Sequence, residues 1–336
     1  MTQPELLLSL FAVVVAAACS ACLTWALRPL LMRYALARPN ARSSHRKPTP
    51  QGAGIAVIAA TLAAASGVIA AWIDSSIPTM VFCATLFIAL VGAADDIKSI
   101  PVLPRLLLQG AAVAAILYAA PGDARIVPAA PLWIERGLLL LAGLWFVNLV
   151  NFMDGLDLMT VAEVVPITGA MVVLGLFGEF PVAGTVVAAA LCGAMLGFAP
   201  FNRPVAKVFL GDVGSLPIGL LLGWCLLQLA YDHHLTAAVL LPLYYLADAT
   251  VTLLRRIARR EPFWAAHRSH FYQHATDNGF PVMGIVSEVF TLNLGLAVLA
   301  FASTAAQSAA LDIAFVVIGA CGVGLTMFRF SRPRPA

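Results

Sequence analysis

The sequence has few charged residues for its length. Only 11% of its 336 residues are Asp, Glu, Lys or Arg, whereas 61% are hydrophobic, and soluble domains carry about 25% charged residues. The mean hydropathy is +0.91. Little of this surface can therefore face water, which excludes an ordinary soluble enzyme and predicts a chain that lies mostly inside a membrane.

The cysteines show neither a disulfide framework nor the spacing of a zinc site. All six lie inside apolar stretches, and Cys19 and Cys22 fall within the first of them, so we interpret them as small residues in helix packing. The N-terminus also lacks the basic stretch of a signal peptide, since Glu5 is the only charge before Arg28. We therefore expect the first apolar stretch to be retained as a helix.

Apolar stretches long enough to span a membrane follow one another along the whole chain. A span needs roughly 20 apolar residues. On that basis the sequence predicts about eleven helices, at 6–27, 53–72, 78–94, 104–120, 132–150, 158–177, 181–199, 215–230, 236–254, 284–303 and 310–328. We predict an all-α polytopic membrane protein with a single catalytic domain over residues 1–336.

The basic residues predict the orientation of this bundle. Eleven spans place the termini on opposite sides. With the N-terminus outside, all of the 20 Lys and Arg residues except Arg125 and Arg136 fall in inside segments, as the positive-inside rule requires. We therefore predict a periplasmic N-terminus and a cytoplasmic C-terminus. The predicted cytoplasmic loops lie at about 28–52, 95–103, 151–157, 200–214 and 255–283.

Two adjacent aspartates, Asp95 and Asp96, end the third predicted span on the inside. Adjacent carboxylates repel each other when both are ionised, so they are kept together where a cation neutralises them or where one holds a proton. A solvated pair at a helix end would give the same sequence. The dipeptide by itself leaves both interpretations open.

A second polar group follows the fifth predicted span. The spacing of three places Asn148, Asn151 and Asp154 along one face of a helix end, and Gly155 then allows a sharp turn before Asp157. Two amides and two carboxylates on one edge suit an oxygen-rich ligand set or a polar substrate. The alternative is a group of interfacial polar residues that join helices.

A third group precedes the eighth predicted span and includes Asn202, Lys207 and Asp212. Gly211 and Gly214 expose backbone N–H groups at a helix N-terminus, which is a place where anions bind. Lys207 adds a charge for a phosphate, and Asp212 can hold a magnesium ion. A helix cap beside a snorkelling lysine is the alternative.

The last long loop carries His267, Arg268, His270 and His274. Histidine and arginine near a phosphate suit neutralisation of a leaving group, and no cysteine or third close carboxylate completes a zinc site. A loop at an anionic membrane surface is the alternative. Asp248, inside the ninth predicted span, is an intramembrane acid and hence a candidate functional residue, although pairing with a nearby arginine is at least as consistent.

Taken together, these motifs resemble those of the polyprenyl-phosphate N-acetylhexosamine-1-phosphate transferases, glycosyltransferase family 4. This family includes the phospho-MurNAc-pentapeptide translocase and the initiating transferases of O-antigen, enterobacterial common antigen and teichoic acid synthesis. The matching segments, in the family's order, are Pro39-Asn-Ala-Arg-Ser-Ser-His45, Pro48-Thr-Pro50-x-Gly52, Asp95-Asp96, Asn151-Phe-Met-Asp154-Gly-x-Asp157, Lys207-Val-Phe-Leu-Gly-Asp212-x-Gly-Ser215 and His267-Arg-Ser-His270.

The resemblance implies a reaction. A sugar-1-phosphate would move from a UDP-N-acetylhexosamine to undecaprenyl phosphate, giving the lipid diphosphosugar and UMP, with Mg²⁺ as cofactor and Mn²⁺ as an alternative. The enzyme would lie in a bacterial cytoplasmic (inner) membrane with its active site on the cytoplasmic face, and would initiate O-antigen or another cell-envelope polysaccharide. Membrane lipids are expected partners and nucleic acid is not. The oligomeric state stays open, with a homodimer as one option.

The resemblance also implies a role for each motif residue. Asp95 would be the base at the lipid phosphate with Asp96 beside it, and Asp154 and Asp157 would be further catalytic residues. The implied metal ligands are Asp212 and Asp154. The implied substrate-binding residues are Lys47, Thr49, Asn148, Asn151, Asn202, Lys207, His267, Arg268 and His270.

Two positions depart from the family pattern. Leu158 stands where the family often has glycine, and the late loop reads His267-Arg-Ser-His270 instead of consecutive histidines. The second departure is more similar to the O-antigen and common-antigen initiators than to the peptidoglycan translocase, which stays the alternative within the family. From another class, a secondary transporter would need polar residues at the bilayer midplane, whereas the polar groups here gather on one face. The sequence does not identify the sugar.

Overall fold

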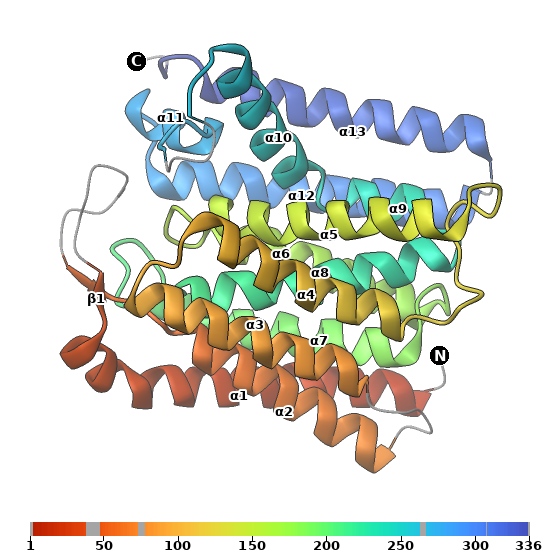
Figure 1. Ribbon diagram of the computed structural model, residues 1–336, viewed down its shortest axis with the longest axis horizontal. Helices are drawn as coiled ribbons and strands as arrows, with labels where there is room; N and C mark the ends of the chain where they lie inside the picture. The colour runs from red at the N-terminus through yellow and green to blue at the C-terminus, as the bar shows by residue number, and fades with distance from the viewer. Residues whose placement is uncertain (1–2, 38–47, 73–77, 263–266, 307, 335–336) are drawn as a thin grey trace.

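Long helices make up most of the computed structural model, which describes residues 3–37, 48–72, 78–262, 267–306 and 308–334 (Figure 1). Two very short strands, β1 (Leu36–Ala37) and β2 (Thr49–Pro50), pair antiparallel. The helices are α1 (Gln3–Tyr34), α2 (Gly54–Trp72), α3 (Thr79–Ile97), α4 (Val102–Ala119), α5 (Leu132–Met153), α6 (Met159–Leu176), α7 (Val182–Phe198), a 3₁₀ turn η1 (Ala199–Phe201), α8 (Asp212–Tyr231), α9 (Leu235–Leu240), α10 (Leu243–Ala258), α11 (Phe271–Asp277), α12 (Val282–Ala306) and α13 (Ala309–Phe330).

Within the described ranges, ten helices are long and apolar enough to cross a membrane, and they are all but α9, α10 and α11. The prediction of an all-α, multi-pass membrane protein is therefore confirmed. The predicted span at 236–254 is divided into α9 and α10 around Leu241 and Pro242, because a proline has no N–H for the helical ladder. Together the two helices still run from one end of the bundle to the other, and the chain starts and finishes at opposite ends (Figure 1).

Proline marks where several of these helices begin. Each of α3, α4, α5, α7 and α12 starts at the residue after a proline, namely Pro78, Pro101, Pro131, Pro181 and Pro281. The residue that precedes a helix donates no N–H to the helical hydrogen bonds, so proline loses no hydrogen bond at this position. The sequence thus sets the point at which each of these helices re-enters the apolar layer.

The loops before α2 and α8 are joined by backbone hydrogen bonds. Phe209 donates its N–H to the carbonyl of Pro50 (2.8 Å) and accepts from Ala53 (3.0 Å), and Gly54 donates to Leu210 (2.9 Å). The start of α2 is thereby held against the start of α8, which also packs against α3 and α5 and is among the most buried helices. These contacts bring together, at one end of the bundle, segments that are far apart in the sequence.

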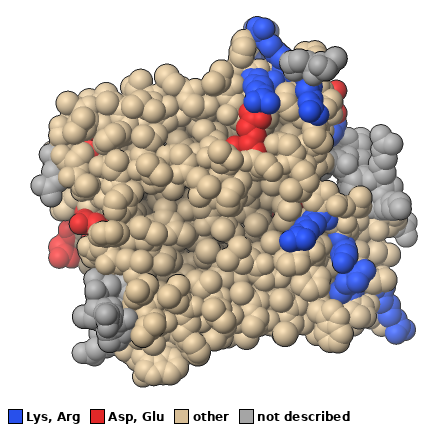
Figure 2. Space-filling model, turned by 180° about the vertical axis from the view of Figure 1, so that it is seen from behind, with Lys and Arg blue, Asp and Glu red and all other residues tan. Residues whose placement is uncertain are grey.

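Basic side chains mark the same end. On the face shown in Figure 2, the visible Lys and Arg residues lie in the right-hand half of the molecule. That half corresponds to the left-hand part of Figure 1, where α3 ends and α11 lies. The rest of the visible surface consists mainly of uncharged residues, as expected where a protein faces lipid.

Candidate active site

Asp96, next to the last residue of α3, holds the first turn of α8. Its two carboxylate oxygens accept hydrogen bonds from the backbone N–H groups of Asp212 and Val213, each at 3.0 Å, and from the side-chain amide of Gln51. A carboxylate at a helix N-terminus satisfies free N–H groups and stabilises the positive end of the helix dipole. Asp96 therefore joins α3 and the loop before α2 to the N-terminus of α8.

Asp95 faces a different set of partners. Its carboxylate accepts a hydrogen bond from the backbone N–H of Ile100 (2.5 Å) and pairs with the Arg105 guanidinium at 2.9 Å. It also lies within hydrogen-bond reach of the Asp212 carboxylate. Two carboxylates in contact need a proton or a cation between them, so this arrangement is suited to a positively charged ligand.

Asn151 joins the end of α5 to the same place. Its amide nitrogen donates to the Asp212 carboxylate and to the Ser215 hydroxyl, each at 2.8 Å. The structure thus brings Asp95, Asp212 and Asn151 into one cluster from three helix ends. The sequence had placed them only on the same side of the membrane.

Asp154 and Asp157 lie in the connection between α5 and α6. The Asp154 carboxylate accepts a hydrogen bond from the Thr160 hydroxyl, and Asp157 accepts one from the backbone N–H of Ala206 at 3.0 Å. Burial, together with the nearby carboxylates of Asp96 and Asp157, raises the pKa of Asp154 to about 7. Its carboxyl group therefore exchanges a proton near neutral pH.

Leu158 adopts a left-handed backbone conformation, with φ of 63°. Its N–H donates to the side-chain oxygen of Asn202 (2.7 Å), whose amide nitrogen donates to the carbonyl of Val208 (3.0 Å). Asn202 is buried and so connects the two motif loops. The left-handed conformation gives a physical reason for the glycine that the family often has at this position.

The late loop lies against the connection that carries Asp154. The Tyr272 hydroxyl donates to the carbonyl of Phe152 at 3.0 Å. A Cβ atom at position 155 would lie 2.1 Å from that hydroxyl oxygen, so only glycine leaves room for it. The loop containing His267 and His270 is therefore packed onto the Asn151–Asp157 segment.

The predicted donor-binding residues of this loop have different surroundings. His270 is buried, whereas His267 is half-buried and stacks on it with ring centroids 5.0 Å apart. Burial and the neighbouring His270 lower the pKa of His267 to about 4, so it is neutral at pH 7. One nitrogen of the Arg268 guanidinium contacts both carboxylate oxygens of Asp277, at 2.7 and 3.0 Å, and the other terminal nitrogen donates to the Thr276 hydroxyl at 2.7 Å.

The remaining predicted residues are Lys47, Thr49, Asn148 and Lys207. Lys47 lies outside the described residues. Thr49 is buried in β2, and Lys207 is exposed in the loop before α8. Asn148 is buried between helices, where its amide nitrogen donates to the Gln109 side chain of α4 at 2.7 Å.

Two residues of the cluster did not stand out in the sequence. Gln51 occupies the variable position of the Pro48-Thr-Pro50-x-Gly52 segment, and Arg105 counted only as one of the inside basic residues. Gln51 contacts Asp96, and Arg105 contacts Asp95. Gln51 could have been found in the sequence because it lies inside a segment that otherwise matched the family motif. Nothing in the local sequence indicated that Arg105 pairs with Asp95.

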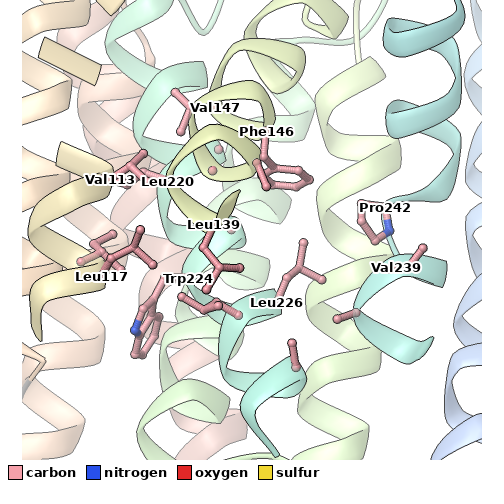
Figure 3. A pocket seen from close by; sticks show the side chains of 18 of the residues that line it. Val113, Leu117, Leu139, Phe146, Val147, Leu220, Trp224, Leu226, Val239 and Pro242 are labelled. Carbon is pink, nitrogen blue, oxygen red and sulfur yellow. The ribbon is translucent and has the colours of Figure 1, made fainter. Parts of the chain in front are cut away.

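A separate cavity of about 220 Å³ lies between α4, α5, α8 and α9 (Figure 3). Its labelled lining residues include Leu139, Phe146, Trp224 and Val239, and no Asp, Glu, Lys, Arg or His side chain lines it. Because the cavity carries no ionisable side chain, it is not part of the acidic cluster.

Comparison with known proteins agrees with the motif pattern. Residues 78–230, which run from the start of α3 to the end of α8, match the family model for glycosyl transferase family 4. A probable undecaprenyl-phosphate N-acetylglucosaminyl 1-phosphate transferase of Bacillus subtilis is 28% identical over 264 residues, covering 73% of this chain and 72% of the relative.

Shorter matches reach higher identity. The phospho-N-acetylmuramoyl-pentapeptide-transferase of Gluconacetobacter diazotrophicus is 36% identical over 147 residues, which cover 38% of this chain and 39% of that protein. That of Streptococcus thermophilus is 35% identical over 131 residues, which cover 35% and 38%. Residues 78–230, the segment that matches the family model, contain the Asp95, Asn151 and Asp212 motifs, so over this part the chain is similar to glycosyl transferase family 4.

Proposed function

We propose that this protein transfers a sugar-1-phosphate from a UDP-N-acetylhexosamine to undecaprenyl phosphate, releasing UMP. The observation that carries the proposal is the cluster of Asp95, Asn151 and Asp212 at one end of an apolar bundle, where three helix ends meet. A site in that position can receive a water-soluble nucleotide sugar and a phosphate attached to a membrane lipid. The family and its relatives support a polyprenyl-phosphate sugar-phosphate transferase.

The reaction makes and breaks one phosphorus–oxygen bond. An oxygen of the lipid phosphate bonds to the phosphorus that carries the sugar, and the bond from that phosphorus to UMP breaks, its electron pair leaving with UMP. Asp95 would accept the proton of the lipid phosphate. Asn151 and the exposed Lys207 would bind the donor's diphosphate. The cluster would then contribute mainly orientation and charge stabilisation.

The same donor set suits a divalent metal bound together with substrate. Within the described ranges, no group of three or more His, Cys, Asp or Glu side chains could hold a metal alone, and Mg²⁺ is usually held by one or two carboxylates plus substrate phosphates. Asp212, in contact with Asp95, and Asp154 in the neighbouring segment are the proposed ligands of Mg²⁺ or Mn²⁺. The ion would neutralise the negative charge of the donor diphosphate.

We place this site on the cytoplasmic face of a bacterial inner membrane, with the N-terminus outside. The basic residues at that end of the bundle support this orientation (Figure 2). UDP-sugars are cytosolic substrates, so the proposed chemistry requires the same side. Initiation of O-antigen or another cell-envelope polysaccharide is the proposed role.

Replacing a carboxylate of the cluster tests the reaction. Asp95→Asn and Asp212→Asn should each lower UMP release at least about 100-fold, because acid–base and charge-stabilising groups contribute factors of this size. Asp123→Asn, an exposed acid in the turn after α4, is the matched control and should keep wild-type turnover. Retained turnover in both cluster variants, with folded protein in detergent, would contradict the active-site assignment.

A second candidate is the phospho-MurNAc-pentapeptide transferase of peptidoglycan synthesis. The 36% identity to the Gluconacetobacter diazotrophicus enzyme favours it, whereas the longer Bacillus subtilis match favours an N-acetylglucosamine donor. A donor screen separates the two. Purified protein, undecaprenyl phosphate and Mg²⁺ are incubated with UDP-GlcNAc, UDP-GalNAc, their deoxy relatives or UDP-MurNAc-pentapeptide, and the donor that yields UMP identifies the reaction.

A further inference from the structure

Asp248, in α10, is fully buried and surrounded by hydrogen-bond donors. Its carboxylate accepts from the ring Nδ1 of His270 (3.1 Å) and from the backbone N–H groups of Phe271 (3.1 Å) and Tyr272 (3.2 Å). A buried carboxylate is stable only when such partners replace water. All three donors belong to the segment that begins α11, so Asp248 fixes this segment to α10.

The remaining contacts of the carboxylate come from its own helix. The hydroxyls of Tyr244 and Thr252 donate to Asp248, each at 3.3 Å. They lie one turn before and one turn after it. These longer contacts hold the carboxylate in place, while the three donors of the 270–272 segment connect it to the late loop.

The contact with Asp248 also determines which nitrogen of the His270 ring carries a hydrogen and how the ring is oriented. Because Asp248 accepts from Nδ1, this nitrogen carries a hydrogen, and the orientation of the ring is fixed. The His270 ring stacks on the rings of both His267 and Tyr272, with distances between ring centroids of 5.0 and 5.7 Å. Asp248 thereby determines where the half-buried ring of His267 can lie.

The same segment contacts the acidic site. The Tyr272 hydroxyl donates to the carbonyl of Phe152, which lies between Asn151 and Asp154 in the chain. The rings of Phe152 and His270 are 6.5 Å apart. A shift of the 270–272 segment would therefore displace both the histidines and the backbone next to the proposed nucleotide-binding residues.

We propose that Asp248 is a positioning residue of the nucleotide-sugar site, acting through His270 to hold the His267–His270 loop against the Asn151–Asp157 segment. The proposal rests on the proposed function, since the ligand positioned is the diphosphate of a UDP-sugar. Asp248 itself is buried and touches no substrate. Its effect is expected on the donor side of the reaction and not on the lipid acceptor.

Asp248→Asn tests the proposal, because asparagine keeps the size of the side chain and one acceptor oxygen but loses the charge. The KM for the UDP-sugar, and the Kd for UDP measured by calorimetry, should rise about tenfold, as expected for a weakened charged hydrogen bond and a displaced binding loop. The KM for undecaprenyl phosphate should stay within about twofold. A merely structural role would lower the folded fraction and hence the apparent kcat, leaving both KM values unchanged.

Glu163→Gln is the matched control. Glu163 is also a buried acid of the bundle, 1% exposed, and it accepts a hydrogen bond from Asn293 in α12 at 2.6 Å. The control should leave the donor KM unchanged. Combining Asp248→Asn with His270→Gln should raise the donor KM by less than the product of the two single effects, because the two side chains are hydrogen-bonded to each other.

The outcomes separate this proposal from the reaction itself. An inactive wild-type protein with every UDP-N-acetylhexosamine would contradict the proposed function, whereas an active wild type and an unchanged donor KM in Asp248→Asn would overturn only the positioning role. If Asp248→Asn does not fold, Tyr272→Phe decides. It removes the hydroxyl bond to Phe152 but keeps the ring and the backbone N–H, so a raised donor KM supports the proposal and an unchanged one overturns it.

Discussion

The start of α2 and the first turn of α8 are in close contact at Gly54 and Gly214. A Cβ atom on Gly54 would lie 2.2 Å from the Cα and 2.4 Å from the N of Gly214, and 2.9 Å from the carbonyl oxygen of Leu210. Carbon atoms need about 3.5 Å, so Gly54→Ala must move the start of α2 away from α8 by about 1.3 Å. Backbone atoms surround the added methyl group, so no side chain can turn aside to make room.

The consequence for activity follows from what this junction carries. Gln51, three residues before Gly54, contacts Asp96, which holds the first turn of α8 and hence Asp212. Overpacking costs about 1–3 kcal/mol, which should leave the protein folded. A displacement of about 1 Å at a reacting group lowers kcat about 100-fold. We therefore expect Gly54→Ala to lose activity far more than stability.

Gly67→Ala is the control for this prediction, because it makes the same substitution in the same helix. No atom lies within 4 Å of a Cβ at Gly67, and alanine in a helix interior is favoured over glycine by about 0.5–1 kcal/mol. UMP release and thermal unfolding in detergent are measured for both variants. Wild-type kcat in Gly54→Ala, or an equal loss in Gly67→Ala, would refute the reasoning.

Two further predictions concern the connection between α5 and α6. At Leu158, the left-handed conformation disfavours side chains by about 1–2 kcal/mol, and most of all those that branch at Cβ. The unfolding temperature of Leu158→Gly should lie within a few degrees of the wild type, and that of Leu158→Val should lie clearly below both. Equal unfolding temperatures for the two variants would contradict the backbone strain. At Asp154, the pKa of about 7 predicts that kcat/KM rises with pH through about 7, a limb that Asp154→Asn should lack. For stability the sign is opposite, because the unfolded carboxyl releases its proton near pH 4, so the free energy of unfolding should fall between about pH 4 and 7 and then level off.

Most of the fold could be predicted from apolar length alone. Ten spans were confirmed because a membrane requires about 20 apolar residues and satisfied backbone hydrogen bonds within each helix. The ninth was wrong as a single helix, although Pro242 stands in the middle of it, because hydropathy counts apolar residues and ignores a missing N–H. The first helix was predicted to end at residue 27, whereas α1 extends to Tyr34. Hydropathy also explains this error, because it predicts where the apolar stretch ends and a helix can continue past the apolar layer.

The site could be predicted in part. The topology placed Asp95, Asn151 and Asp212 on one side. The contacts of Asp212 with Asn151 and Asp95 join residues 61 or more positions apart, and no local pattern contains such a pairing. Asp248 shows the limit most clearly. Its partners at 270–272 lie in a loop whose histidines were predicted to bind the donor, and the sequence suggested an arginine as a partner for Asp248. Only the packing of α11 reveals that Asp248 instead accepts hydrogen bonds from the first residues of this helix.

The structure also separates two aspartates that the sequence presents as a pair. Both oxygens of Asp96 are engaged by backbone N–H groups of α8, and displacing them would uncap a buried helix. Asp95 accepts one backbone N–H, that of Ile100, and its other oxygen pairs with Arg105, whose side chain can turn away when a lipid phosphate or a metal arrives. The two adjacent acids therefore have different roles: Asp96 fixes the N-terminus of α8, and Asp95, beside it, is the residue that we propose as the base.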